Sequence, residues 1–175
     1  MNRRMWICIP LAIAILSTGA LTKTKKPTAK VTLTDAKGAS VGTATIRQEG
    51  NGVSVDLNLM NLTPGEHAIH FHEKPSCTAP DFKSAGGHFN PTGAHHGLHN
   101  PAGPHAGDME NFTVAADGTS HQTMVDDRVT LEPGKPNSLY ANGGTSLVIH
   151  AKADDMMSDP AGNSGDRIAC GVITR

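Results

Sequence analysis

Aromatic residues are scarce in this chain of 175 residues. They make up 3% of the sequence, within a hydrophobic content of 37%, so large rings cannot dominate a core. A core must instead be built from Val, Ile, Leu, Met and Ala. Together with 19 Gly and 11 Pro, this composition favours thin, close-packed sheets joined by many turns. The length is sufficient for one domain with a substantial core.

The chain also lacks an excess of charge. Its formal net charge is -1 at pH 7, and no basic run is longer than the one at 23–26. A nucleic-acid-binding protein needs a basic surface, so we expect no nucleic-acid partner. Low-complexity segments and internal repeats are absent as well.

The only long apolar run lies at the N-terminus. Arg3 and Arg4 precede an apolar stretch at 5–16, and the small residues at 17–20 suit cleavage near Ala20, as in an export signal. The run is short for a membrane span, although an uncleaved anchor is the alternative. Export would place the protein in the periplasm, or otherwise secreted or anchored outside the cytoplasm.

These observations divide the chain into three parts. We predict a signal peptide or anchor at 1–20, a flexible Lys-rich leader at 21–28 and a single domain at 29–175. Only two of the three cysteines, Cys77 and Cys170, lie in the domain. In an exported protein this pair is most simply a disulfide, whereas in the cytosol the two would more simply be unrelated thiols.

Short segments of alternating polar and apolar residues run through the domain, with Gly, Pro, Asn and Asp at the turns between them. They fall at 31–34, 41–47, 53–59, 67–72, 112–115, 121–125, 129–131, 146–151 and 168–173. About eight strands and no convincing helix predict an all-β fold, an eight-stranded Greek-key sandwich or barrel of immunoglobulin-like type. Two long loops, 73–110 and 154–166, would carry the function.

Histidine is concentrated between residues 68 and 108, which hold seven of the ten in the chain. They are His70, His72, His88, His95, His96, His99 and His105. Such a density indicates a metal site or a pH-sensing surface, and a metal is favoured because imidazole suits both copper and zinc. Alternation along 67–72 puts His70 and His72 on one face and Phe71 on the other. A metal and a disulfide would also order a loop that is otherwise too long.

Three separated stretches carry a resemblance to a known family. They are A-I-H-F-H-E at 68–73, G-H-F-N-P at 87–91 and G-N-S-G-D-R-I-A-C-G at 162–171. These stretches resemble the hallmark motifs of copper/zinc superoxide dismutases, and the resemblance extends over about 29–175. It implies an enzyme that cycles copper between Cu(II) and Cu(I) to convert superoxide to O2 and hydrogen peroxide, protecting the exported compartment. It further implies one copper and one zinc per subunit. The protein would be a monomer or a homodimer, and it would contact no membrane except through a possible N-terminal anchor.

The resemblance also assigns metal ligands. The implied copper ligands are His70, His72, His88 and His150. The implied zinc ligands are His88, His96, His105 and Asp108. His88 would thus bridge the two metals, and it would also hand a proton to the substrate.

Other positions match the family in supporting roles. Asp154 matches an aspartate that hydrogen-bonds ligands of both metals, and Arg167 matches an arginine that guides the anionic substrate. Cys77 and Cys170 match the internal disulfide. The loop at 155–166 departs from many members because it contains no lysine, so steering would be weaker or would come from elsewhere, for example Lys74, Lys83 or Lys152.

The remaining histidines have simpler interpretations. His95 competes with His96 for zinc, and His96 is preferred because it precedes Gly97, as in the family. His67 is expected to be a packing or surface residue, and His99 and His121 are expected to be solvated. Met156 and Met157 are expected to pack within their loop. The competing functions are a non-enzymatic, superoxide dismutase-like metal-binding protein and a copper store.

Overall fold

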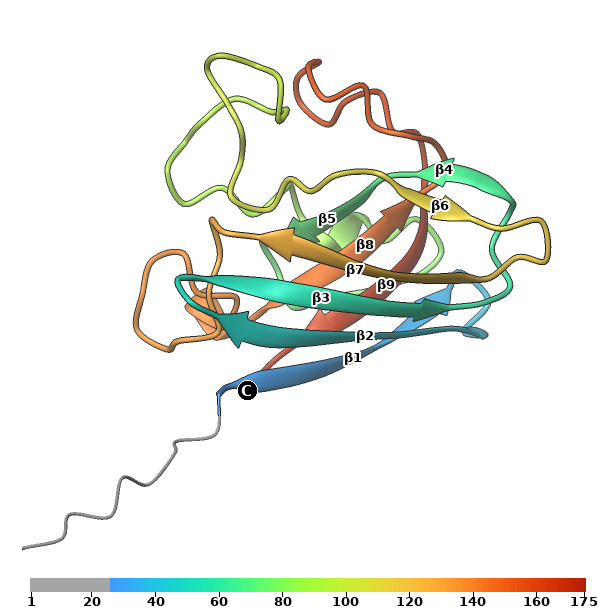
Figure 1. Ribbon diagram of the computed structural model, residues 1–175, viewed down its shortest axis with the longest axis horizontal. Helices are drawn as coiled ribbons and strands as arrows, with labels where there is room; N and C mark the ends of the chain where they lie inside the picture. Colours follow the sequence, from blue (N-terminus) through green and yellow to red (C-terminus); the bar gives the residue numbers. More distant parts are fainter. Residues whose placement is uncertain (1–25) are drawn as a thin grey trace, which may run out of the picture.

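The computed structural model describes residues 26–175, so the expected signal segment and most of the leader lie outside the described residues. Seven strands form one curled antiparallel sheet in the order β5-β8-β9-β1-β2-β3-β7 (Figure 1). Their bounds are β1 Thr28–Asp35, β2 Ser40–Glu49, β3 Gly52–Leu59, β5 Ile69–His72, β7 Ser120–Asp126, β8 Thr145–His150 and β9 Arg167–Ile173. A two-stranded sheet pairs β4 (Gly65–His67) with β6 (Phe112–Val114), and β6 leads into β7. The predicted all-β architecture is confirmed.

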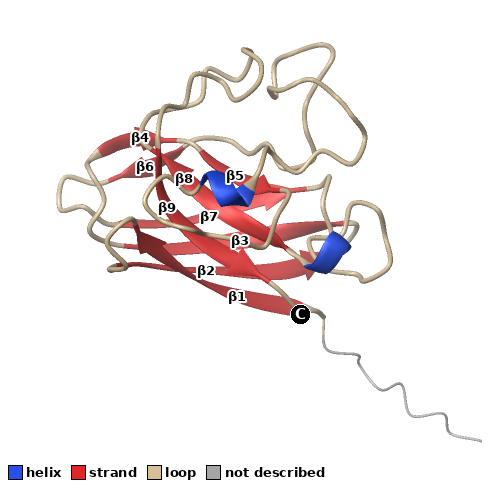
Figure 2. Cartoon of the chain, turned by 180° about the vertical axis from the view of Figure 1, so that it is seen from behind, coloured by secondary structure: helices blue, strands red, loops and turns tan. Residues whose placement is uncertain are grey.

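Helix is nearly absent from the described residues. Figure 2 shows two single-turn 3-10 helices, η1 at Lys83–Ala85 and η2 at Ala141–Gly143. Within 26–175 no helix has the length and apolar character needed to cross a bilayer.

Aliphatic side chains fill the space inside the curled sheet. On β3, Val55 and Leu57 are buried in this core, whereas Asn58 between two buried neighbours is exposed. All six residues of β8 are buried, because the sheet interior covers one face and the segment around η1 covers the other. There Phe82 and Ala85 pack against Val148. The three successive apolar residues of β8, Leu147, Val148 and Ile149, thus reflect burial on both faces.

Two expected strands differ in the structure. The segment at 67–72 is divided into β4 and β5 at Ala68, whose N–H donates to Lys152 O at 2.8 Å. The segment at 129–131 is not a strand of either sheet. Its apolar residues are buried, but Thr130 Oγ1 and the Leu131 N–H donate to Gln48 Oε1 at 2.9 and 2.7 Å. The alternating polar and apolar residues of this segment are explained by burial of the segment against the Gln48 side chain, because the hydrogen bonds from Thr130 Oγ1 and the Leu131 N–H go to that side chain and not to a neighbouring strand.

Two long loops rise together from one end of the sheet. In both views, the loop that follows η1 and the loop between β8 and β9 stand side by side above β5 and β8 (Figures 1 and 2). The first is fastened to β5 by its backbone, since Phe71 N–H donates to Gly107 O at 3.0 Å and Phe89 N–H donates to Phe71 O at 2.8 Å. This attachment brings loop side chains over the end of β5.

Candidate metal centre

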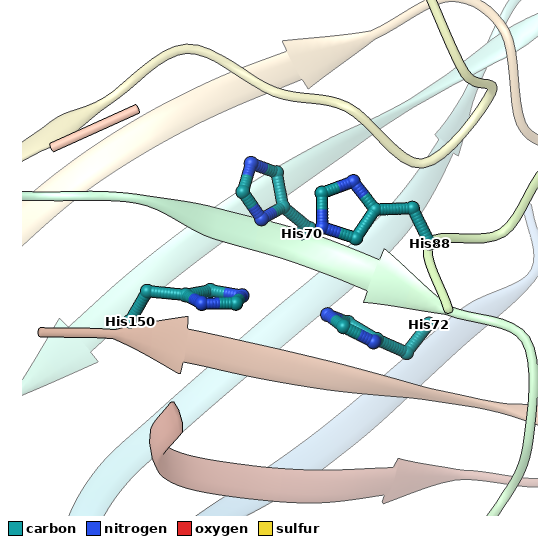
Figure 3. A group of neighbouring side chains, drawn as sticks. All are labelled: His70, His72, His88 and His150. Atoms are coloured by element: carbon teal, nitrogen blue, oxygen red, sulfur yellow. The ribbon is translucent and has the colours of Figure 1, made fainter. Parts of the chain in front are cut away.

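Strand β5 places two histidines beside each other. His70 and His72 project from one face of the strand, and Phe71 between them lies in the core on the other face, as the alternation predicts. Isolated backbone bridges join His72 to His88 and His70 to Asp108. His150 ends the neighbouring strand β8. Figure 3 shows the resulting cluster, with the rings of His70, His72, His88 and His150 turned toward one another.

Four histidines form the first potential metal-binding group: His70, His72, His88 and His150. Their ligand atoms all lie within 4.8 Å of one another, and all four residues are buried. They come from β5, the following loop and the end of β8, so the sheet and the first loop together assemble the group.

Three histidines and a carboxylate form the second group: His88, His96, His105 and Asp108. The Nδ1 atoms of His88, His96 and His105 lie 2.8, 3.1 and 3.3 Å from Asp108 Oδ1. A tetrahedral zinc site with bonds of about 2.0 Å separates its ligands by about 3.3 Å, so the spacing suits zinc. Asp108 Oδ2 is fixed separately, because the N–H groups of Gly97 and His105 donate to it at 2.9 Å each. His88 belongs to both groups, one ring nitrogen facing each.

One nitrogen of each ring in the first group points outward or toward the second group. His70 Nε2 lies 2.8 Å from Asp154 Oδ2, and His72 Nδ1 lies 3.0 Å from Gly86 O. His150 Nδ1 lies 3.1 Å from Ser164 Oγ. Such partners fix which nitrogen of each ring remains available to a metal.

The other nitrogens of these rings have no partner in the described residues. Four of them face the first group: His70 Nδ1, His72 Nε2, His88 Nε2 and His150 Nε2. A buried polar atom without a hydrogen bond is costly, so four in one place call for a ligand. Four imidazole nitrogens suit Cu(II), whereas the nitrogen-and-carboxylate set of the second group suits zinc. The residues present therefore fit both metals.

Burial keeps these rings in the neutral form that binds metal. Burial, together with the neighbouring His70, lowers the pKa of His88 to about 3 and that of His150 to about 2. Burial likewise holds the pKa of His72 well below its usual value. For Asp154, burial alone would raise the pKa of the carboxyl, but hydrogen bonds from His70 and His96 outweigh burial and lower it, so the carboxylate is ionised. The first group is thus made of neutral imidazoles, whereas in the second group the hydrogen bonds of His96 to Asp108 and Asp154 outweigh burial and raise the pKa of His96 to about 9.

Asp154 connects the two groups. Its carboxylate contacts His70 Nε2 at 2.8 Å and His96 Nε2 at 3.0 Å, so it holds one ring from each group. Its backbone is held in turn by Asn111, whose side chain accepts from Asp154 N–H at 2.8 Å and donates to Asp154 O at 2.9 Å. Gly162 crosses directly over this carboxylate with a φ of +60°.

Arg167 lies next to the first group, because it pairs with His150 across β8 and β9. Its guanidinium donates to Phe82 O at 2.8 Å and to Gly86 O at 2.7 Å. It also lines a cleft of about 550 Å³ together with Asp81 and Lys83. Of the three lysines considered for steering, Lys83 lines this cleft, where it forms an ion pair of 3.0 Å with Asp81.

The disulfide links Cys77 to Cys170, 93 positions apart in sequence. It joins the segment that carries Phe82 and Gly86 to β9, the strand that begins with Arg167. The disulfide therefore links the segment that provides Phe82 O and Gly86 O to β9, the strand that provides the Arg167 guanidinium they bind.

Three histidines lie apart from the two groups: His95, His99 and His121 are exposed. His95 Nδ1 instead contacts Asp159 Oδ2 at 2.6 Å. His67 is buried, as the packing interpretation expects, and it is also bound at both ring nitrogens, to His150 O at 2.8 Å and Thr63 O at 2.7 Å. Met156 is buried in its loop, whereas Met157 is half exposed.

Sequence reasoning did not identify several residues that orient the ligands, namely Gly86, Asn111, Gly162 and Ser164. Gly86 and Asn111 act through contacts to segments distant in sequence, for which the chain carries no local signal. Gly162 and Ser164 lie inside a family-like motif, but the motif alone does not indicate what they touch.

A curled antiparallel β-sheet that buries two metal-binding groups with one imidazole in common defines a binuclear metalloprotein. The sequence model of copper/zinc superoxide dismutases matches residues 40–173. The chain belongs to this family, which uses copper and zinc.

Relatives and solved structures agree with this membership. The chain is 52% identical over 138 residues to superoxide dismutase [Cu-Zn] 1 of Aquifex aeolicus, covering 78% of this chain and 82% of the relative. It is 44% identical over 139 residues to superoxide dismutase [Cu-Zn] of Caulobacter vibrioides, covering 78% and 79%. The crystal structure of a SOD-like protein from Bacillus subtilis matches with a TM-score of 0.80 and 39% identity, covering 82% of this chain and 97% of that one. The Cu/Zn superoxide dismutase from Brucella abortus matches with a TM-score of 0.69 and 31% identity, covering 84% and 99%.

Proposed function

We propose that this chain disproportionates superoxide at a copper ion held by the four-histidine group, beside a zinc ion held by the second group. The observation that carries the proposal is the convergence of four buried imidazole nitrogens that have no hydrogen-bond partner within residues 26–175. The copper ligands would be His70, His72, His88 and His150. The zinc ligands would be His88, His96, His105 and Asp108.

Copper bound there would supply one-electron chemistry between Cu(II) and Cu(I), so that one superoxide is oxidised to O2 and a second, with two protons, is reduced to hydrogen peroxide. The protein's own part begins with His88. Its Nδ1 faces Asp108, and its Nε2 faces the copper group and has no hydrogen-bond partner among the described residues. His88 Nε2 can therefore hold a proton whenever it is not a ligand, which places a proton donor against the substrate.

Arg167 would attract the anion. Its guanidinium is fixed by two backbone carbonyls, which hold the positive charge beside the copper group without neutralising it. A fixed charge in a cleft concentrates a small anion near the open face of a metal. The cleft also holds Lys83, which pairs with Asp81, and the carboxylate of Asp166, so Arg167 is the cation of this cleft that is held by backbone carbonyls and not by a carboxylate.

A second candidate is a non-enzymatic metal-binding protein. A Bacillus subtilis relative, 39% identical over 145 residues, is named superoxide dismutase-like and not superoxide dismutase, which is the reason to test this alternative. Against it, every residue expected in the two ligand sets is present and buried in this chain.

The two functions are separated by measuring superoxide consumption with the protein loaded with copper and zinc. We expect rapid consumption by the loaded protein and only the background rate with the metal-free protein. His150→Ala, loaded in the same way, removes one expected copper ligand and should lose the activity. An inactive loaded wild-type protein would support the non-enzymatic alternative.

Export is a further part of the proposal. The pattern at 1–20 is that of a signal, and the Cys77–Cys170 disulfide suits an oxidising compartment. Expression of the full chain followed by intact-mass measurement should find a protein cleaved near Ala20 outside the cytoplasm. A full-length mass in a membrane fraction would indicate an anchor instead.

Gly162→Ala should weaken both metal sites. A β-carbon at this position would overlap Asp154 Oδ1 and lie 2.8 Å from His96 Nε2, so the carboxylate that joins the two groups must move. Loss of such supporting contacts typically lowers metal affinity about 10–100-fold. Competition titrations with Zn(II) and Cu(II) measure the change.

Gly93→Ala is the matched control for that substitution. Gly93 has a φ of +68°, close to the +60° of Gly162, but an added β-carbon would meet nothing within 4 Å. Both variants carry the left-handed backbone penalty of about 1–2 kcal/mol, and only one disturbs Asp154. Equal losses of affinity in the two variants would show that backbone strain, not displacement of Asp154, is responsible.

A further inference from the structure

Ser164 contacts one of the expected copper ligands in a way that the proposed function does not use. Its side chain is buried, with 2% of the residue exposed. Its Oγ lies 2.8 Å from Ala161 O and 3.1 Å from His150 Nδ1. The residue belongs to the loop between β8 and β9, whereas His150 ends β8, so the contact joins the loop to the copper group.

The direction of the two hydrogen bonds follows from the atoms. A carbonyl oxygen only accepts, so the single hydroxyl hydrogen of Ser164 is donated to Ala161 O. The hydroxyl can then only accept from His150, and Nδ1 must carry the ring proton. That tautomer leaves the lone pair on His150 Nε2, the nitrogen that faces the other three rings and has no hydrogen-bond partner in the described part of the chain.

Among the described residues, His150 Nδ1 has one other acceptor, the backbone carbonyl of Gly165. Gly165 O lies 3.4 Å away, at the limit of a useful hydrogen bond. The other two rings with an outward nitrogen have stronger acceptors, since His70 faces the carboxylate of Asp154 at 2.8 Å and His72 faces Gly86 O at 3.0 Å. The Ser164 hydroxyl is therefore the nearer of the two acceptors that face His150 Nδ1.

We propose that Ser164 is a positioning residue for copper, which fixes the tautomer and the ring orientation of His150 through its hydroxyl. The proposal rests on the proposed function, because it requires that the four-histidine group binds copper. It assigns to the loop between β8 and β9 a direct contact with a copper ligand, in addition to its contact with His70 and His96 through Asp154.

The test compares Cu(II) affinity and the Cu(II) electron paramagnetic resonance spectrum in the wild-type protein and Ser164→Ala, both preloaded with Zn(II). We expect about 10-fold weaker Cu(II) binding in the variant, at the lower end of the about 10–100-fold range for groups that orient a ligand. We also expect an altered spectrum, because one of the four nitrogens is less firmly placed. Ser164→Thr keeps the hydroxyl and should restore both properties.

Ser146→Ala is the matched control. Ser146 is also a fully buried serine, it lies on β8 four positions before His150, and its Oγ has no partner in the described residues. Loss of that hydroxyl should leave copper affinity and spectrum unchanged.

Three outcomes would overturn the role of Ser164. Wild-type affinity and spectrum in Ser164→Ala would show that the hydroxyl does not position His150. An equal loss of Zn(II) affinity, measured on the metal-free variant, would show that it acts only by anchoring the loop through Ala161. Failure of the wild-type protein itself to bind Cu(II) would overturn the proposed function and this role with it, whereas the first two outcomes leave the proposed function standing.

Discussion

Replacing His88 with alanine is expected to weaken copper and zinc binding together. His88 is the one residue common to both groups, with Nδ1 facing Asp108 and Nε2 facing the histidines on β5 and β8. Four-ligand zinc sites are worth roughly 10–16 kcal/mol, so losing one ligand of four costs about 3 kcal/mol, or about 100-fold in affinity. We expect a loss of at least this size for each metal, measured by competition titration with each ion separately.

Two single-site controls make that result specific. His150 belongs only to the first group and His105 only to the second. His150→Ala should weaken copper binding and leave zinc affinity unchanged. His105→Ala should weaken zinc binding, and it should affect copper binding only indirectly, by changing the contacts that hold His88. If His88→Ala behaved like either control, with one metal lost and the other retained at wild-type affinity, the shared imidazole would be refuted.

The sequence is most informative where local periodicity decides orientation. On β5, alternation alone predicts that Phe71 enters the core while His70 and His72 share the opposite face, and the structure agrees. All four residues of β5 are buried, so its register decides the faces: a shift of one residue would turn His70 and His72 into the core and Phe71 toward the metal-binding groups. The residues that the resemblance places in the two metal sites are also those that the structure brings together.

Periodicity is less informative where burial comes from something other than a sheet. The segment at 129–131 alternates like a strand, but its backbone and hydroxyl bond to the Gln48 side chain. His67 was expected to pack or to be exposed, and nothing in its neighbourhood predicts that its ring joins Thr63 O to His150 O. Contacts between segments 14 to 83 positions apart leave no local signal, which is why Gly86, Asn111 and Ser164 were identified only in the structure, whereas Asp154 was expected from the resemblance.

Removing the Cys77–Cys170 disulfide should lower the free energy of unfolding by about 4–5 kcal/mol. The bond closes a loop of 93 positions, and in the chain-entropy model a loop of this length restricts the unfolded chain by that amount. The double variant Cys77→Ser with Cys170→Ser avoids a free thiol. Denaturant unfolding of the metal-free proteins measures the change without the contribution of bound ions.

The same variant should also impair the loaded protein. The segment closed by the disulfide supplies Phe82 O and Gly86 O to the Arg167 guanidinium, and Gly86 O also holds His72 Nδ1. Without the disulfide, the segment that supplies these carbonyls is more mobile, so the hydrogen bonds to Arg167 and His72 are formed for less of the time. Superoxide consumption should therefore fall even at temperatures where the variant is folded. Lys37→Ser, on the exposed turn between β1 and β2, serves as a surface control and should match the wild-type protein in both measurements. A stability loss below about 1 kcal/mol with unchanged turnover would mean that the packing of Phe82 and Ala85 against Val148, and not the covalent bond, holds this segment in place.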